Sequence, residues 1–454
     1  MIVGFSNFGF SNYRLDLEKV FATIALLFYS ELLAFQSLFS LSEGEGASFF
    51  PTSAYNPLTP LLRLTQHGIF IVTLGLLVLR WRRTLQVSAK GIFFWGLLLL
   101  MLASPLWSDT PGATQRSAIS LLETTLFGLY FAARFSMQEQ LKLLTVCGSI
   151  FAVVSLLFSL AVPGAAIEAG VHAGAWRGPL IQKNLFARAL VLFAIAAYIN
   201  QPTRWLGKAI GSLTLLLCIF LIVLSASKTA IVILILMLAL IELQRFLYKL
   251  FVGMPMLFVP VVCAVLLSGM AAIVLAVTQA QAIVDLTGRD LTLSGRTEIW
   301  SALIVKINER PLLGYGYQGF WRGIYGESAY IGKVFGNTYL PPHSHNGFFE
   351  LTLAFGLLGL GLFALTFLVN ARFALLLPAI TSPAVALWPL AYLTFIVLYN
   401  QTESTLVAHN SIFWALYVAL TFSKASAVEL EDEPLLEDAC ADEQTTLARS
   451  RLTA

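Results

Sequence analysis

The chain contains twelve apolar runs of about 20 residues, and these runs constrain its fold more than any other feature. Each run is long enough to cross the roughly 30 Å hydrocarbon core of a bilayer as a helix. Backbone polar groups cannot stay unpaired in lipid, so helices are the expected spanning form. Hydrophobic residues make up 58% of the 454 residues and charged residues only 12%, far from the balance of a soluble domain. The sequence therefore predicts an all-α polytopic membrane protein with about twelve transmembrane helices, at 19–41, 60–80, 91–107, 117–134, 143–163, 185–200, 206–226, 229–244, 254–278, 346–370, 379–399 and 408–423.

Basic residues between these runs indicate the orientation of the chain, because cytoplasmic loops are enriched in Lys and Arg. With a cytoplasmic N-terminus, the loops on that side carry Arg80, Arg82, Arg83, Lys90, Arg134, Lys142, Arg204, Lys208, Arg245, Lys249 and Arg372. The alternate short loops 42–59 and 400–407 contain no Lys or Arg, and 108–116 contains only Arg116. We therefore expect both termini in the cytoplasm and the longest loop, about 279–345, outside it.

The chain is expected to have three regions: a cytoplasmic N-terminus (1–18), a transmembrane domain (19–424) and a tail (425–454). The first apolar run is too long for a signal peptide and lacks a small-residue cleavage site, so it is predicted to remain as a helix. The tail is polar and acidic, which is typical of a disordered segment. The four cysteines are scattered, which indicates neither a disulfide framework nor a thiolate metal site.

The long outer loop contains a second kind of apolar pattern. Between residues 297 and 308 apolar residues recur at helical spacing, which predicts an amphipathic helix lying on the membrane or the bundle; they are Ile299, Trp300, Leu303, Ile304 and Ile307. Arg296 precedes this helix. The sequence GYGYQG follows it, at 314–319, without a preceding strand, so we predict no dinucleotide site. A flexible aromatic loop is expected instead, with rings that suit sugars beside a cation.

Two further segments place cations at the outer ends of predicted helices. In HAGAWRGPLIQKNLFAR, residues 172–188, Arg177 and Lys183 lie with glycines at a helix entry, which suits a phosphate. The alternative is interfacial anchoring. In LSASKTAI, residues 224–231, Lys228 lies between two apolar runs, which makes it a functional candidate unless it merely snorkels to the interface.

The segment PPHSHNGFFELTLAFGLLGLGLFAL, residues 341–365, starts with two histidines and continues as an apolar helix. At 100° per residue His345, Thr352, Gly356 and Gly359 fall within about 40° of one another. Gly356 and Gly359 are then expected to let a neighbouring helix approach closely. A histidine at this helix N-terminus should remain neutral and can accept a proton. The alternative is a surface histidine at a helix cap.

His343 fits that simpler interpretation and is predicted to be a bystander. A metal site built from His343, His345 and Glu350 is a poor prediction, because the HxH pair lies on an irregular segment and no carboxylate is clearly positioned. We therefore predict no metal.

Together, these motifs resemble those of the Wzy/WaaL superfamily, which includes O-antigen ligases, O-antigen polymerases and ExoQ-type exopolysaccharide polymerases. The matching features are His345-Asn346 followed by Gly356-x-x-Gly359, the periplasmic segment GRTEIW…RPLLGYGYQGFW, the tripeptide at 227–229 and GAWRGPLIQKN. The resemblance covers roughly 172–370. It departs from the family pattern in having Lys228 where many relatives have arginine, and Gln182 where histidine is common.

The resemblance implies an inverting, metal-independent glycosyltransferase with a GT-C-like helical fold, no cofactor and undecaprenyl-diphosphate-linked glycans as donors. By analogy Arg296 and Lys228, with Arg177 and Lys183, would hold the donor diphosphate, and His345 would assist the acceptor hydroxyl. Arg296 and His345 would then be the catalytic residues. Bidentate guanidinium binding suits a diphosphate, and stabilising this leaving group should supply much of the catalysis.

The expected function is that of a polysaccharide polymerase in the bacterial inner membrane, which transfers a growing glycan onto the next lipid-linked repeat unit. The alternative is an O-antigen ligase that transfers the same donor to lipid A core. A flippase and a chain-length regulator are the expected protein partners, and no nucleic acid is expected. An inorganic-carbon transporter is a third hypothesis; it needs opposed ionisable groups within the membrane, and Glu31, Glu123 and Glu242 show no such pair in the sequence.

Overall fold

The structure, a computed structural model, describes residues 16–39, 56–200, 202, 204–251, 296–323, 326–335, 340–377 and 383–423. Within these residues the regular secondary structure is helical, apart from one isolated bridge between Ile167 and Trp176. The elements are α1 (Leu17–Tyr29), η1 (Leu32–Ala34), η2 (Gln36–Leu38), α2 (Thr59–Leu79), α3 (Trp81–Ser88), α4 (Ile92–Ala103), η3 (Ser104–Leu106), α5 (Pro111–Arg134), α6 (Met137–Ala161), α7 (Pro163–Ala166), η4 (Gly170–His172), α8 (Lys183–Ile199), α9 (Trp205–Leu224), α10 (Lys228–Phe251), α13 (Arg296–Glu309), α14 (Ala329–Val334), α15 (Gly347–Leu376), α16 (Pro383–Tyr399) and α17 (Ile412–Phe422).

The all-helical fold agrees with the prediction, and each predicted span except 254–278 overlaps a helix. The range 254–278 and the acidic tail lie outside the described residues. By length and composition, five of the described helices can cross a membrane, and seven can if each of two bent pairs forms one span. The chain is thus a multi-pass membrane protein on this criterion, while the total of twelve spans stays a prediction.

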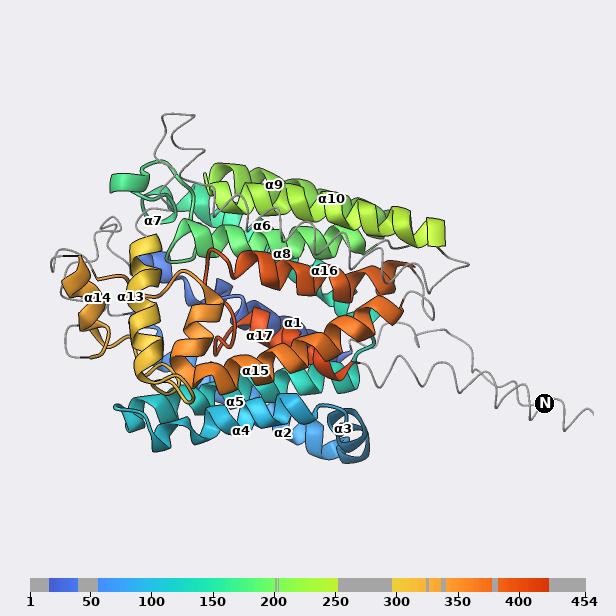
Figure 1. The fold of residues 1–454 in the computed structure, drawn as a ribbon. Coiled ribbons are helices and arrows are strands. Elements are labelled where there is room, and N and C mark those ends of the chain that lie inside the picture. The colour runs from blue at the N-terminus through green and yellow to red at the C-terminus, as the bar shows by residue number, and fades with distance from the viewer. Residues whose placement is uncertain are drawn as a thin grey trace, which may run out of the picture.

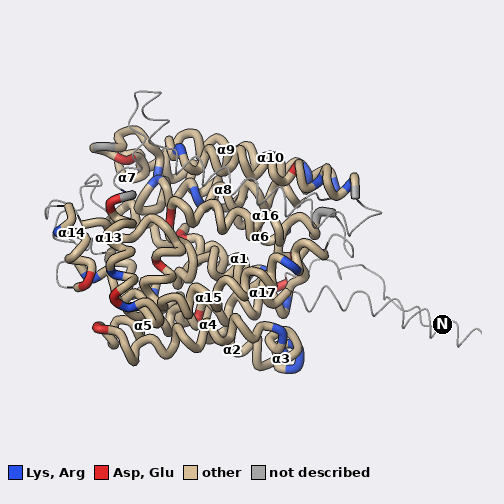
Figure 2. Tube along the Cα trace, viewed as in Figure 1, with Lys and Arg blue, Asp and Glu red and all other residues tan. Residues whose placement is uncertain are grey.

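The long helices run side by side as one bundle, and α13 crosses one end of it (Figure 1). Local sequence fixes where several of them begin: Pro111 opens α5, and Ser136 with Glu139 forms a capping box at the start of α6. The basic residues of α3 and of the end of α10 lie at the end opposite α13 (Figure 2). This distribution agrees with an extracytoplasmic position for α13.

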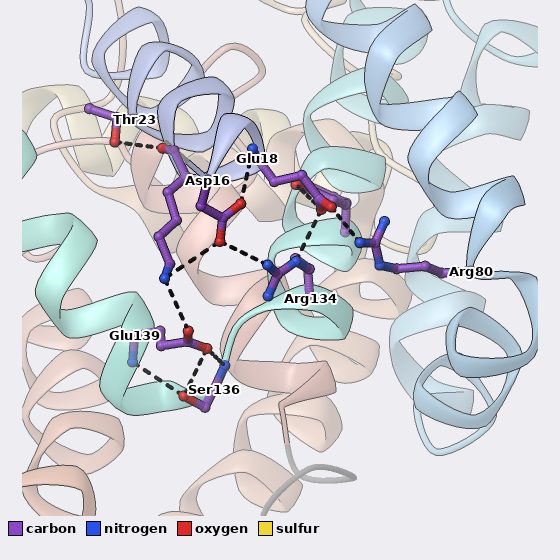
Figure 3. A network of polar contacts seen from close by, with 9 residues as sticks. Asp16, Glu18, Thr23, Arg80, Arg134, Ser136 and Glu139 are labelled. Carbon is purple, nitrogen blue, oxygen red and sulfur yellow. Dashed lines mark hydrogen bonds and ion pairs between the residues drawn. The ribbon is translucent and has the colours of Figure 1, made fainter. Parts of the chain in front are cut away.

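An ion-pair network joins α1 to α2, α5 and α6 (Figure 3). Arg134 at the end of α5 contacts Asp16 at 3.0 Å and Glu18 at 3.1 Å. Glu18 also pairs with Arg80, which follows α2. Lys19 lies between Asp16 and Glu139 of α6, at 3.5 and 3.7 Å. The network therefore fixes the first helix against α2, α5 and α6.

Helix α15 is broken at Gly356, about a third of the way along it, where φ is 62° and ψ is −165°. A break inside a membrane span leaves backbone groups that lipid cannot satisfy. The loop 311–316 satisfies them. This loop belongs to the outer layer, which consists of α13, α14 and the loops next to them. Four hydrogen bonds join the two segments, from the N–H of Tyr315 to the carbonyl of Leu353 (2.7 Å), of Gly316 to Ala354 (3.0 Å), of Leu357 to Pro311 (2.7 Å) and of Leu358 to Leu312 (3.3 Å).

Glycine is required on both sides of this junction. A Cβ at Gly356 would lie 2.2 Å from the backbone C and O of Leu312, and a Cβ at Gly314 would lie 2.4 Å from the carbonyl oxygen of Leu353. Both glycines also have a φ of 62°, in the left-handed region that side chains rarely adopt. The outer loop and the broken helix can therefore approach closely only because neither has a side chain at the contact.

The predicted helical face of His345, Thr352, Gly356 and Gly359 is wrong. Helix α15 begins after His345 and is interrupted at Gly356, so helical periodicity does not relate the two. Gly356 meets loop backbone instead of a neighbouring helix. Gly359 does face α4, since a Cβ there would lie 3.6 Å from Cδ2 of Leu100.

The outer layer has its own small hydrophobic core. Its buried members are Ile299, Ala302, Leu303, Tyr315, Phe320, Ile331 and Leu353. The predicted helix at 297–308 is confirmed as α13, and its buried apolar face packs into this core rather than on lipid. The predicted flexible aromatic loop is wrong, because Tyr315, Tyr317 and Phe320 are buried and unavailable to stack on a sugar.

We expect Gly356→Ala to destabilise the protein, because the added methyl group meets the backbone of Leu312 and the residue must keep a positive φ. Strain and overpacking of this kind cost about 2 kcal/mol or more, and thermal unfolding in detergent should show a midpoint lower by about 4 °C or more. Gly361→Ala is the matched control on the same helix, since nothing lies within 4 Å of its added Cβ. Equal midpoints for the two variants would contradict the junction described above.

Candidate active site

His345 and Asn346, directly before α15, have different structural roles. Asn346 is the N-cap of the helix, and its Oδ1 accepts hydrogen bonds from the N–H groups of Phe348 (2.9 Å) and Phe349 (3.3 Å). His345 has a φ of 53°, which is uncommon outside glycine. Its backbone N–H donates to Nδ1 of His343 at 3.1 Å. Asn346 therefore caps the helix, while His345 lies in a turn outside it.

Three other elements hold this turn in place. Trp300 of α13 donates from Nε1 to the carbonyl of Ser344 at 2.9 Å, and the N–H of Ser344 donates to Glu350 at 2.6 Å. Trp321 donates to both carboxylate oxygens of Glu350 at 2.9 Å. Glu350 was the carboxylate considered for a metal site with the two histidines. Ser344 and Trp321 already engage Glu350, and a different carboxylate faces the histidines.

The carboxylate beside the histidines belongs to Glu403. One ring nitrogen each of His343 and His345 and a carboxylate oxygen of Glu403 all lie within 4.8 Å of one another. The imidazole rings of the two histidines are 4.1 Å apart between centroids. Glu403 is only 4% exposed. A buried carboxylate next to two imidazoles is an arrangement that can move or hold a proton.

Asn400, at the end of α16, positions the loop that carries Glu403. Its side-chain oxygen accepts hydrogen bonds from the N–H groups of Thr405 (2.7 Å) and Leu406 (3.1 Å). Its backbone carbonyl accepts from the N–H of Gly347 at 2.9 Å. A Cβ at Gly347 would lie 2.1 Å from Oδ1 of Asn400, so the first residue of α15 must be small. The Glu403 loop and the histidine turn are therefore joined directly.

Two arginines from distant parts of the chain act on the same cluster. Burial lowers the pKa of His343 to about 3, and the neighbouring His345, Arg188 and Arg296 contribute in the same direction. Arg296 is half-buried at the start of α13. Arg188 of α8 is only 8% exposed, stacks over the ring of Phe413 at 4.7 Å, and has no hydrogen-bond partner for its Nε. The cluster therefore has a cationic side suited to an anion.

His343, which was predicted to be a bystander, contacts His345 directly. Its Nδ1 accepts the N–H of His345, which supports the left-handed turn at that residue. Its lowered pKa keeps the ring neutral, so Nδ1 remains an acceptor and the proton is on Nε2. His343 is therefore a positioning residue for His345.

Two histidines and a glutamate are also the ligands of many zinc sites. Here Nδ1 of His343 is already engaged, and two guanidinium groups act on the same ring. Such positive charge disfavours a divalent cation nearby. The surroundings therefore suit an anionic substrate group better than a metal ion.

Arg177 is buried and bound to backbone carbonyls. It is 4% exposed, and its guanidinium donates to the carbonyls of Ala165 (2.8 Å), Ile181 (3.1 Å) and Ser37 (3.5 Å). Burial lowers its pKa, partly offset by Glu168. Arg177 therefore ties together the segments around the entry of α8, and the geometry gives no support for its predicted contact with a diphosphate.

The other two predicted cations lie at neighbouring helix starts. Lys183 begins α8, and its backbone N–H donates to the carboxylate of Glu168 at 2.7 Å, so the expected phosphate position is occupied by a side chain. Lys228 begins α10 and is exposed. The hydroxyl of Ser227 donates to Asn184 at 3.0 Å, which joins the two helix starts. Among the described residues no hydrogen bond or ion pair places Lys183 or Lys228 against the histidine cluster.

Sequence reasoning missed Glu403 and Arg188. Arg188 is the sole charged residue in the predicted span 185–200, and a charge within a membrane span is a functional signal by default. Glu403 gives no comparable signal, because it lies in a short polar loop about 60 residues away from His345 in the sequence. The contact between Asn400 and Gly347, which the sequence does not reveal, brings this loop to the histidines.

The expectation of no opposed ionisable pair within the membrane is also wrong. Nδ1 of His67 lies 2.9 Å from Glu123, and Gln66 donates to the same carboxylate. Asn410 in turn donates to Gln66 at 2.9 Å. This group joins α2 and α5 to the segment before α17, so its contacts are explained by packing of three elements.

Comparison with known proteins gives two matches. Residues 213–364 match the model of the O-antigen ligase family, Wzy_C. This range includes Lys228, Arg296 and His345 but excludes Arg188 and Glu403. The chain is also 25% identical over 320 residues to the exopolysaccharide production protein ExoQ of Rhizobium meliloti (strain 1021), a match that covers 68% of this chain and 70% of ExoQ.

Both matches agree with the resemblance predicted from the motifs. Residues 213–364 are similar to the O-antigen ligase family and the sequence is similar to ExoQ, and both findings support a place in the Wzy/WaaL superfamily.

Proposed function

We propose that the chain polymerises undecaprenyl-diphosphate-linked oligosaccharide repeat units on the extracytoplasmic side of the bacterial inner membrane. The family and the relative support a membrane enzyme of polysaccharide synthesis that resembles glycosyltransferases. The observation that carries the finer proposal is the cluster of His343, His345 and Glu403 beside Arg188 and Arg296. In the proposal, this cluster supplies a proton acceptor next to a cationic site that binds an anion, at the extracytoplasmic end of the bundle.

In the proposed reaction His345 takes the proton of the acceptor sugar hydroxyl. The hydroxyl oxygen forms a bond to the anomeric carbon of the donor glycan, and the bond from that carbon to the diphosphate oxygen breaks. Attack opposite the leaving group inverts the anomeric configuration. The carboxylate of Glu403 stabilises the imidazolium that forms on His345, as the third member of a triad does.

The leaving lipid diphosphate takes the departing electron pair, and Arg296 and Arg188 bind its negative charge. Guanidinium groups present planar pairs of N–H donors that match phosphate oxygens. The partly buried surroundings strengthen this interaction, because fewer water molecules screen it. No resident metal ion or cofactor has a role in this proposal.

Lys228 and Lys183 remain in the proposal as cations that attract the donor to the outer surface, and Arg177 is left out because backbone carbonyls engage it. A flippase that supplies the repeat units and a chain-length regulator are the proposed partners. A ligase that transfers the glycan to lipid A core would use the same donor chemistry, so the acceptor is what distinguishes the two activities.

Purified protein should form polymer from the lipid-linked repeat unit alone, measured by gel electrophoresis of the labelled glycan. Adding lipid A core should produce no additional product. A product that appears only when lipid A core is present would show a ligase and overturn the polymerase proposal.

We expect His345→Ala to lower the turnover number by about 100-fold or more, because a positioned general base contributes this much. Arg296→Ala and Arg188→Ala should each cost about 100-fold through weaker stabilisation of the leaving group. Glu403→Gln, which keeps the size of the side chain but removes its charge, should cost at least about tenfold. His172→Ala and Arg63→Ala, on the same side of the bundle, are the controls. Near-normal turnover in a folded His345 or Glu403 variant would reject the role assigned to that residue.

His343→Ala should lower turnover by about five- to tenfold, because one hydrogen bond that supports the turn at His345 is lost. His343→Asn should restore most of it, since its side-chain oxygen can accept the same N–H. The pKa of His343 is about 3, so this residue is neutral from pH 5 to pH 8 and does not titrate there. The pH–rate profile of the Asn variant should therefore keep its shape, whereas a displaced limb would show that His343 is itself the titrating base.

A further inference from the structure

A second group of cations lies at the outer end of α5, outside the site described above. The guanidinium of Arg322 has two buried nitrogens, Nε and Nη2, without a hydrogen-bond partner. Burial lowers the pKa of Arg322, and the neighbouring charge of Arg116 lowers it further. A partly buried arginine beside a second arginine is unfavourable unless an anion joins them.

Close backbone contacts bring these two arginines together. The loop before Arg322 packs on the start of α5, where a Cβ at Gly316 would lie 2.7 Å from Cβ of Ser108 and a Cβ at Gly319 would lie 2.9 Å from its hydroxyl oxygen. Arg116, on the second turn of α5, folds back so that its Nη1 is 3.8 Å from the Cβ position of Gly112. The guanidinium of Arg116 therefore lies near the start of α5, where the loop that leads to Arg322 also packs.

The backbone of Arg322 is itself held in place. Its N–H donates to the hydroxyl of Ser328 at 3.1 Å, and that hydroxyl donates to the carbonyl of Gly323 at 3.1 Å. Ser328 is fully buried. The guanidinium therefore extends from a fixed turn.

The outer-layer carboxylates that are closest in sequence to Arg116 and Arg322 have other partners. Asp109 pairs with Arg310 at 3.0 Å, and Glu327 pairs with Lys306 at 2.8 Å. Glu350 accepts hydrogen bonds from Trp321. Among the described residues no ion pair joins Arg116, which is exposed, or Arg322, which is partly buried, to a carboxylate.

The segments that carry these two arginines also have exposed apolar side chains. Leu106 before α5 is 87% exposed, Leu312 of the outer loop is 68% exposed, and Ile119 is exposed on the next turn after Arg116. On a membrane protein such a surface faces lipid. An anion carried on a lipid tail fits this position better than a free anion.

We propose that Arg116 and Arg322 bind the diphosphate of the acceptor's polyprenyl carrier. This inference rests on the proposed polymerase function, in which donor and acceptor are both lipid-linked diphosphates. Two such anions repel each other strongly in a partly buried site, so each needs its own cations. Arg188 and Arg296 then serve the donor, and the pair on α5 holds the acceptor's carrier.

Native mass spectrometry of the full chain with undecaprenyl diphosphate tests this directly. We expect wild-type protein and Arg63→Ala to bind two molecules per chain. In Arg322→Ala and in Arg116→Ala, one of the two undecaprenyl diphosphate molecules should bind at least about tenfold more weakly. Arg322→Lys should weaken this binding less, because lysine keeps the charge. Arg296→Ala should lose the other molecule, so that the Arg296→Ala, Arg322→Ala double variant binds neither.

Two outcomes would overturn the proposal. One is a folded Arg322→Ala variant that binds undecaprenyl diphosphate as the wild type does. The other is an Arg322→Ala variant that loses bound phosphatidylglycerol and not undecaprenyl diphosphate, which would show that the two arginines bind a phospholipid.

An activity measurement separates this inference from the proposed function. With a lipid-linked acceptor, Arg322→Ala should raise the acceptor KM at least about tenfold, with little change in the donor KM. With an alkyl glycoside acceptor that lacks a diphosphate, variant and wild type should be equal; an equal loss with both acceptors would overturn the inference. Binding of two carriers without any polymer formation would contradict the polymerase function while leaving the second site intact.

Discussion

The pairing between the broken helix α15 and the loop 311–316 is the interaction on which the rest of the outer structure depends. Four backbone hydrogen bonds replace those that the helix loses at Gly356. In lipid these groups have no other partners, so the loop cannot leave without exposing them. The same loop leads from α13 to the buried aromatic residues, which fixes the whole outer layer on the bundle.

The candidate site follows from that anchoring. Trp300 of α13 holds the histidine turn directly, and Trp321 holds it through Glu350. The position of the turn therefore depends on the position of the outer layer. Asn400 then joins the turn to the loop of Glu403. The site is thus assembled from elements far apart in the sequence, and Arg188 enters it from the membrane bundle. In the proposed function, this arrangement provides a proton acceptor and a site for an anion at the extracytoplasmic end of the bundle.

The sequence predicted the features that depend on local pattern. Apolar runs predicted the helices, and the spacing of Ile299, Leu303 and Ile307 predicted α13. The predicted helical face from His345 to Gly359 is wrong because periodicity assumes a continuous helix. Gly356 instead adopts a non-helical conformation that its partner loop stabilises. Arg177 has the residue type of a phosphate ligand, yet backbone carbonyls engage it. Glu403 was missed because its role depends on a tertiary contact.

The central claim is that His345 and the arginines at 188 and 296 act on opposite sides of the donor's anomeric carbon. A cryo-electron microscopy structure of the protein with a non-transferable lipid diphosphate glycan tests it most directly. The account predicts phosphate oxygens about 3 Å from the guanidinium groups of Arg188 and Arg296, with the His345 ring facing the anomeric carbon from the other side. A diphosphate bound at Arg177 and Lys183 instead, with His345 remote from the sugar, would contradict it.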